Sequence, residues 1–176
     1  MRKLSTEELI ANKGDHKKLR DAPRNEVYLI LEDIRSMYNV GAIFRTADAA
    51  RVKMLYISGI TATPPRAEIE KTALRTTDPE AGGVPWEQVK NLKSKIQILK
   101  KQGVQIIALE QTNKSVDFHK FSYKKPLAII VGNEVDGIAE ETLKLCDAAV
   151  EIPMQGISNS LNVATAAGII LFEAIE

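Results

Sequence analysis

Hydrophobic positions along this chain form short, nearly continuous runs separated by segments with helical periodicity. The runs predict strands at Val27–Leu31, Val52–Ser58, Val104–Leu109, Leu127–Val131 and Ala148–Pro153. The remaining segments predict helices at about Val40–Ala50, Ala67–Leu74, Trp86–Gln102, Ala139–Leu145 and Leu161–Ile175. Strands of Val, Ile and Leu that alternate with helices are typical of a parallel sheet covered on both faces. We therefore predict an α/β fold.

Two segments depart from this pattern. Residues 1–25 are polar and rich in charge, and they predict a basic tail with a short helix. Residues 26–176 then form one α/β domain. Thr61–Glu87 is rich in Pro, Gly and Thr and holds one short helical pattern, so it is expected to be a long loop of the kind that is often functional.

Polar side chains follow the first predicted strand, in the stretch NVGAIFRTADAA. Asn39 is expected to be the N-cap of the next helix, because its side-chain oxygen can accept from free backbone amides. Arg45 lies six residues further on, where a guanidinium must be paired, solvated or used. Pairing with Asp48, three positions later, would stabilise the helix by a few tenths of a kcal/mol and is the structural alternative to a functional role.

Polar residues also follow the fourth and fifth predicted strands. In IIVGNEVDGI, Gly132 permits a sharp turn, and Glu134 stands at the sheet edge, although a plain turn with a helix-entry charge fits as well. Ser160 and Asn162 lie in the polar run that precedes a helix of small residues. Ligands of parallel α/β sheets bind at the carboxyl ends of strands, so we expect these clusters to meet in one site.

Composition narrows the class of protein. Hydrophobic residues make up 44% of the chain, charged residues 27%, and no apolar run reaches the length of a membrane span. The charged N-terminus lacks the apolar core of a secretory signal, and Cys146 is the single cysteine, so we expect a cytoplasmic protein without a disulfide within the chain. Two histidines and one cysteine argue against a zinc site, and we expect no metal and no membrane contact.

Charge is unevenly distributed along the chain. From Leu127 onward there are one basic and eight acidic residues, a net charge of −7, whereas the preceding part has 23 basic and 15 acidic residues, a net charge of +8. A basic N-terminal portion is compatible with a polyanionic partner, and equally with ordinary solvated surface charge. The chain has no dinucleotide fingerprint, no P-loop and no G-x-S-x-G elbow.

The three polar segments, in this order, resemble the three motifs of the SpoU (TrmH-like) branch of the SPOUT methyltransferases. That family transfers a methyl group from S-adenosylmethionine to a ribose 2′-hydroxyl in RNA. The resemblance covers Val27–Glu176 and implies a parallel-sheet SPOUT fold with a C-terminal deep trefoil knot. It also implies a homodimer that acts on RNA, with transfer RNA favoured over ribosomal RNA.

The resemblance further implies roles for individual residues. Those in catalytic positions are Asn39, Arg45, Glu134, Ser160 and Asn162. Those expected around the cofactor are Leu109, Glu110, Gly132, Ile152, Pro153, Met154 and Leu161. In the segment KTALRTTD, Arg75-Thr76-Thr77 replaces the Gly-Ala-like residues common in the family, which leaves the role of this loop open.

Two other interpretations fit parts of the sequence. One is an RNA-binding protein of the same fold without catalysis, and the other is an α/β enzyme that binds a nucleotide through a different phosphate loop. If the chain is a methyltransferase, Arg45 can clamp the phosphate beside the target ribose or assist deprotonation of the hydroxyl. We favour the clamp, because a guanidinium is a very weak base and binds phosphate in a bidentate manner.

Overall fold

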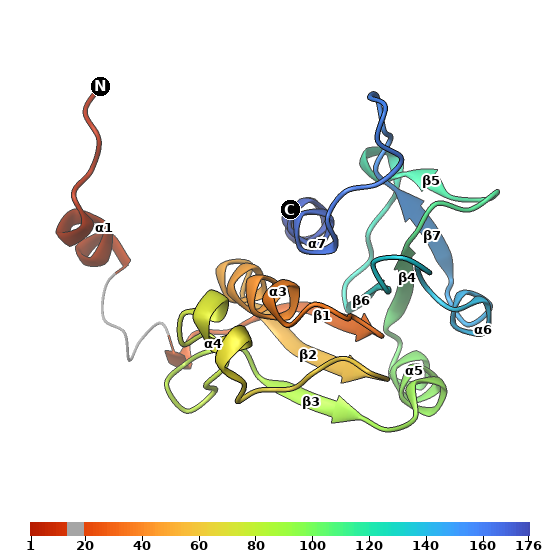
Figure 1. The fold of residues 1–176 in the computed structure, drawn as a ribbon, viewed down its shortest axis with the longest axis horizontal. Helices are drawn as coiled ribbons and strands as arrows, with labels where there is room; N and C mark the ends of the chain where they lie inside the picture. The colour runs from red at the N-terminus through yellow and green to blue at the C-terminus, as the bar shows by residue number, and fades with distance from the viewer. Residues whose placement is uncertain (14–19) are drawn as a thin grey trace.

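The computed structural model describes residues 1–13 and 20–176, which form an α/β fold around a seven-stranded sheet. The strand order is β3-β2-β1-β6-β4-β7-β5, and each neighbouring pair runs parallel (Figure 1). The strands are β1 (Asn25–Glu32), β2 (Val52–Ser58), β3 (Trp86–Val89), β4 (Gln105–Leu109), β5 (Val116–Asp117), β6 (Leu127–Val131) and β7 (Ala148–Glu151).

The helices follow the predicted pattern with shifted ends. Within the described ranges they are α1 (Thr6–Lys13), α3 (Met37–Ala49), α4 (Ala67–Ala73), α5 (Leu92–Lys101), α6 (Glu140–Leu143), α7 (Val163–Ile175) and the short 3-10 helix η1 (Phe118–Lys120). The expected tail thus contains a helix, α1, while its residues 14–19 lie outside the described part. None of the described helices is long and apolar enough to cross a membrane.

Two strands were not predicted. The segment expected to be one helix, Trp86–Gln102, contains β3 and then α5. The break is made by Asn91, whose side chain accepts from the amide of Ser94 at 2.9 Å and so starts α5 there. The other strand is β5, which pairs with β7. It has only two residues, too few to leave a hydrophobic pattern in the sequence.

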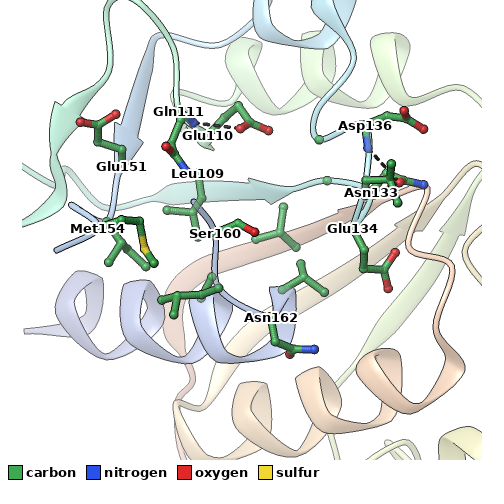
Figure 2. A pocket seen from close by; sticks show the side chains of 18 residues that line it. Leu109, Glu110, Gln111, Asn133, Glu134, Asp136, Glu151, Met154, Ser160 and Asn162 are labelled. Carbon is green, nitrogen blue, oxygen red and sulfur yellow. Dashed lines mark hydrogen bonds between the residues drawn. The ribbon is translucent and has the colours of Figure 1, made fainter. Parts of the chain in front are cut away.

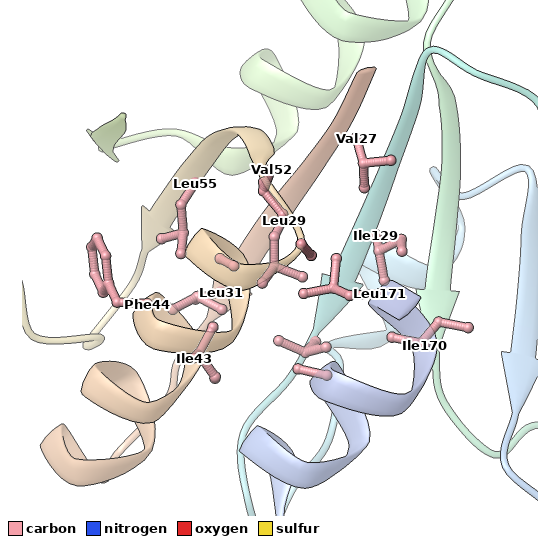
Figure 3. Packing of buried hydrophobic residues seen from close by; sticks show 14 of the residues in the cluster. Val27, Leu29, Leu31, Ile43, Phe44, Val52, Leu55, Ile129, Ile170 and Leu171 are labelled. Atoms are coloured by element: carbon pink, nitrogen blue, oxygen red, sulfur yellow. The ribbon is translucent and has the colours of Figure 1, made fainter. Parts of the chain in front are cut away.

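The two faces of the sheet carry separate hydrophobic cores. On one face, Leu29 and Leu31 of β1 pack with α3, α4 and α7 (Figure 3). On the other face, Ile30 of the same strand packs with α5 and with residues of β2, β4 and β6. This alternation along one strand is the period-2 burial of a sheet covered on both sides.

Glycines set how closely α3 approaches its neighbours. A Cβ on Gly41 would collide with the side chain of Thr72 and the carbonyl oxygen of Ile69, both on α4. Gly168 of α7 faces α3, where an added Cβ would lie 3.5 Å from Cγ2 of Thr46. The first contact leaves no room for a methyl group, whereas the second is ordinary van der Waals contact.

We predict that Gly41→Ala lowers the free energy of unfolding by about 1–3 kcal/mol, because the new methyl group must push α4 away from α3. Urea unfolding followed by circular dichroism measures the change.

Gly168→Ala is the matched control. It adds the same methyl group to a helix with room for it, and should be neutral or stabilising by up to about 1 kcal/mol through helix propensity. If Gly41→Ala proved as stable as Gly168→Ala, the close packing of α3 on α4 would not contribute to stability.

Candidate active site

A cavity of about 470 Å³ opens at the carboxyl ends of β4, β6 and β7 (Figure 2). Its wall is completed by the segment that leads into α7. The lining residues are Leu109, Glu110, Gln111, Val131, Gly132, Asn133, Glu134, Val135, Asp136, Gly137, Glu151, Ile152, Met154, Ser160, Leu161, Asn162, Val163 and Ala166. The cavity thus lies at the ends of the third, fourth and fifth predicted strands, and the segment after the first predicted strand, with Asn39 and Arg45, does not line it.

Most of the residues expected around a cofactor lie in this wall. They are Leu109, Glu110, Gly132, Ile152, Met154 and Leu161. Pro153 is exposed and is not part of the lining. Gly132 is required by the packing, because a Cβ there would collide with the backbone of Gly137 and Ile138.

Glu134 joins the β6 end to the segment after β1. Its carboxylate accepts from the backbone amide of Arg35 at 2.9 Å and from that of Ser36 at 3.0 Å. The side-chain amide of Asn39 donates to it at 2.8 Å. Glu134 thus stabilises the amino-terminal end of α3, where unpaired amides and the helix dipole favour a negative charge.

The pKa of Glu134 reflects these contacts. Partial burial raises the pKa, but the hydrogen bonds from Arg35, Asn39 and Ser36 outweigh it, so the pKa of Glu134 lies below its ordinary value. The carboxylate is therefore ionised at neutral pH.

The sequence predicts Asn39 as the N-cap of α3, and this prediction is wrong. The cap is Ser36, whose hydroxyl accepts from the amide of Asn39 at 3.3 Å, so the helix starts three residues earlier. This position leaves the Asn39 side chain free to bridge: it donates to Glu134 and accepts from the side-chain amide of Asn162 at 3.0 Å. Asn162 in turn caps α7, accepting from the amide of Ala164 at 2.9 Å.

Two further residues of the wall, Glu110 and Asn133, hold the turn after β6. Glu110 accepts from the amide of Ile138 at 3.0 Å. Asn133 donates to the carbonyl of Asp33 at 2.8 Å and accepts from the amide of Val135 at 2.8 Å. The role of Asn133 was missed, although it stands in the G-N-E segment that drew attention to Glu134.

Gln111 and Glu151 were also missed. Both line the cavity, and the side chain of Gln111 donates to the carbonyl of Asn159 in the segment before α7 at 2.6 Å. Glu151 accepts from the hydroxyl of Ser115 at 2.6 Å. Their positions directly after β4 and at the end of β7 were the available signal.

Arg45 lies outside this cavity, in a second groove of about 550 Å³ between α3, α4 and α7. Six residues along a helix rotate a side chain by about 240°, so Arg45 and Asn39 project from different faces of α3. Arg45 is exposed and, among the described residues, its guanidinium forms neither a hydrogen bond nor an ion pair, so it is not paired with Asp48, which has another partner.

The charged side chains in the cavity wall all have one sign. They are Glu110, Glu134, Asp136 and Glu151, and the wall contains no Lys, Arg or His. The described residues contain no cluster of three or more His, Cys, Asp and Glu that could hold a metal ion. The arrangement suits a ligand that carries positive charge and many hydrogen-bonding groups.

We predict that Glu134→Gln lowers the free energy of unfolding by about 1 kcal/mol. The amide retains one acceptor oxygen but turns an NH₂ group toward a backbone donor. Chemical denaturation at pH 7 gives the value. Since the pKa of Glu134 is depressed in the folded state, its contribution is present above the unfolded pKa of about 4.3 and is lost as pH falls through the folded pKa.

Asp136→Asn is the control, since Asp136 is an exposed carboxylate on the same turn. It should leave stability within about 0.5 kcal/mol. An equal loss in both variants, or a difference between wild type and Glu134→Gln that persists at pH 2.5, would contradict the specific role of the Glu134 contacts.

Comparison with known proteins places the chain in a family. Residues 26–172 match the model of the SpoU rRNA Methylase family. The chain is 34% identical over 154 residues to a tRNA (guanosine(18)-2′-O)-methyltransferase of Aquifex aeolicus, covering 86% of this chain and 69% of the relative. It is 35% identical over 150 residues to the 23S rRNA (guanosine-2′-O-)-methyltransferase RlmB of Vibrio parahaemolyticus, covering 84% and 58%.

The fold is also found in solved structures. The crystal structure of an AdoMet-bound rRNA methyltransferase from Sinorhizobium meliloti matches with a TM-score of 0.76 and 34% identity, covering 89% of this chain and 59% of that one. The chain thus spans between 58% and 69% of the length of these proteins.

Proposed function

Since the chain belongs to the SpoU rRNA Methylase family, we propose that it transfers the methyl group of S-adenosylmethionine to a ribose 2′-hydroxyl in RNA. The observation that carries the proposal is the cavity at the ends of β4, β6 and β7, in a fold shared with an AdoMet-bound rRNA methyltransferase. Transfer RNA is the first candidate substrate, because several relatives, among them that of Aquifex aeolicus, are named tRNA methyltransferases. Ribosomal RNA is the second candidate.

The cavity fits S-adenosylmethionine in charge. The cofactor carries a sulfonium, an ammonium and one carboxylate at neutral pH, a net charge of +1, and the charged side chains in the cavity wall are carboxylates. Residues that would hold it are Leu109, Glu110, Gly132, Ile152, Met154 and Leu161, with Pro153 beside them. When bound, S-adenosylmethionine supplies an electrophilic methyl group.

Arg45 would act on the RNA rather than on the cofactor. A ribose hydroxyl is a poor nucleophile, so it must be held in line with the methyl group while its proton leaves. The exposed guanidinium of Arg45 can bind the phosphate beside the target ribose through two parallel hydrogen bonds. It is a poorer candidate for the base, because its pKa lies far above neutral.

Asn39, Glu134 and Asn162 would position the reacting groups. Their hydrogen-bond chain joins three strand-end segments, so a change in one moves the wall of the cavity. Ser160, which stands in the same wall, has its side chain available for the ribose or the cofactor.

We predict that the wild-type protein transfers labelled methyl groups from S-adenosylmethionine to RNA, and that Arg45→Ala abolishes the transfer. Cofactor binding should stay within a few-fold, because Arg45 lies outside the cavity. Nuclease digestion of the product should place the label on a 2′-O-methyl nucleotide, and separate tRNA and rRNA fractions identify the substrate.

Arg45→Lys is the matched variant. It should also be badly impaired, since an ammonium cannot reproduce the bidentate contact. Near-normal activity of this variant would contradict the clamp. Cofactor binding without transfer to any RNA would favour a catalytically silent RNA-binding protein, and absence of cofactor binding would overturn the proposal in favour of another nucleotide-binding enzyme.

We further propose that the protein is a homodimer that pairs through α3 and α7. The groove between these helices has apolar walls that include Ala42, Ala49 and Phe172, and Phe172 is 48% exposed. Tyr38, on the exposed side of α3, is 49% exposed. A second copy would cover these apolar side chains and leave Arg45 at the edge of the contact, open to RNA.

Light scattering at micromolar concentration should give about twice the chain mass of 19.4 kDa. Phe172→Glu should shift the mass toward that of one chain, because it places a charge in the apolar contact. A wild-type mass of 19.4 kDa would contradict the dimer.

The remaining features follow the family resemblance and stay proposals. Residues 26–176 would form the methyltransferase domain, and residues 1–25 a basic tail. The C-terminal part would carry the deep trefoil knot, which is compatible with the placement of β7 between β4 and β5. A cytoplasmic location and a reaction without a metal agree with an RNA substrate and this cofactor.

A further inference from the structure

In the turn after α4, two consecutive non-glycine residues have a left-handed backbone conformation. Leu74 has φ of +52° and Arg75 has φ of +69°. Residues other than glycine avoid this region, because their Cβ approaches a backbone carbonyl. Glycine is the usual residue just beyond a helix end, so a leucine followed by an arginine keeps strain that a glycine would remove.

Hydrogen bonds on both sides of these residues fix the turn. The amide of Leu74 donates to the carbonyl of Glu70 at 3.2 Å, which ends α4. The hydroxyl of Thr77 donates to the carboxylate of the same Glu70, with distances of 2.8 and 2.9 Å to its two oxygens. The indole of Trp86 donates to the carbonyl of Thr77 at 3.1 Å. The surrounding contacts therefore impose the conformation of Arg75 and hold it.

A second arginine anchors the far side of the same loop. The guanidinium of Arg24 donates to the carbonyl of Gly82 at 3.0 Å and to that of Gly83 at 2.6 Å. Burial, followed by the nearby charge of Arg51, lowers the pKa of Arg24 from its ordinary value, as expected for an arginine enclosed by the protein. Arg24 thus has a structural role in the loop.

Arg75 differs from Arg24 in its exposure and in its side-chain contacts. It is exposed, and within the described part of the chain its guanidinium has no hydrogen bond or ion pair. The acidic side chains nearest in the turn are engaged with the turn itself: Glu70 accepts from Thr77, and Asp78 accepts from the amide of Glu80 at 3.0 Å. The turn therefore presents to solvent an arginine that forms no ion pair with a described residue.

The position of Arg75 connects it to the groove that contains Arg45. Leu74, its immediate neighbour, lines that groove together with Arg45 and Lys71. Lys71 is also exposed and, among the described residues, has no ion-pair partner. Two cations, Arg45 of α3 and Lys71 of α4, thus line the groove, and Arg75 directly follows a residue of its wall.

We propose that Arg75 binds a backbone phosphate of the RNA substrate and helps to determine which RNA is accepted. The proposal rests on the RNA-methylating function proposed above and adds a residue to it. The fixed backbone sets where the Arg75 side chain leaves the turn, and its planar guanidinium can form two hydrogen bonds to one phosphate. The phosphate would neighbour the one assigned to Arg45.

The test replaces Arg75 with glycine, which removes the charge and also the backbone strain. Arg75→Gly should keep the melting temperature or raise it by up to about 3 °C. Its KM for the RNA fraction methylated by wild type should rise about 3- to 10-fold, with kcat and cofactor binding within two-fold. The plot of log affinity for that RNA against log salt should become less steep by about one unit.

Two further variants make the result specific. Arg75→Lys keeps the charge and should retain the salt slope while losing part of the affinity. Lys101→Ala removes an exposed cation from α5, which packs on the opposite face of the sheet, and should change nothing. Equal losses in Arg75→Gly and Lys101→Ala would reduce the effect to overall charge and overturn the proposal.

The two proposals can fail separately. Methyl transfer by wild type with an unchanged KM and salt slope in Arg75→Gly would overturn the role of Arg75 and leave the methyltransferase intact. If RNA binding depended on Arg75 but no methyl group were transferred, the role of Arg75 would stand and the methyltransferase proposal would be overturned. A change in dimer mass without a change in RNA binding would assign Arg75 to the subunit contact and overturn the proposal.

Discussion

The site depends on one carboxylate that accepts hydrogen bonds from a segment about 100 residues away in the chain. Glu134 pairs two backbone amides at the start of α3 and orients Asn39. Without it, those donors would exchange the carboxylate for water, and the connection between the two segments would be lost. Asn39 extends the connection to Asn162, so the ends of β1 and β6 and the start of α7 are held together by a single chain of polar contacts.

Close packing fixes the orientation of α3, so that two of its faces carry different candidate functional residues. Gly41 brings α4 against one side, and Gly168 of α7 lies against another, so α3 has little freedom to shift or rotate. In its first turn Asn39 contacts Glu134 and Asn162 of the cavity wall, and in its middle Arg45 lines the groove. Residues from one short motif are thereby delivered to two different surfaces of the molecule.

Much of this arrangement could be predicted, and the failures have physical causes. Continuous apolar runs predicted five strands, and the rule that ligands bind at strand ends brought Glu134 and Asn162 together. The sequence pattern predicts helix over β3, because its four residues merge with the periodicity of α5 and only the cap at Asn91 separates them. Ser36 and Asn39 are both good caps, so the sequence does not say which starts the helix. Helix geometry alone predicts that Arg45 and Asn39 project from different faces of α3. The groove that contains Arg45 depends on how α4 and α7 pack on α3, which no local sequence pattern reveals.

The order of the strands has a consequence for how the protein becomes active. β7 lies between β4 and β5, both of which precede it in the chain, and the last wall of the cavity comes from residues after Ser160. The sheet centre of β1, β2 and β6 can be complete while the cavity is still open. Assembly of the site therefore waits for the final segment to find its place among strands already formed, and such long-range contacts are the slow step in folding. A nascent chain of this protein can complete its ligand site only after the residues up to Ala166 have been synthesised.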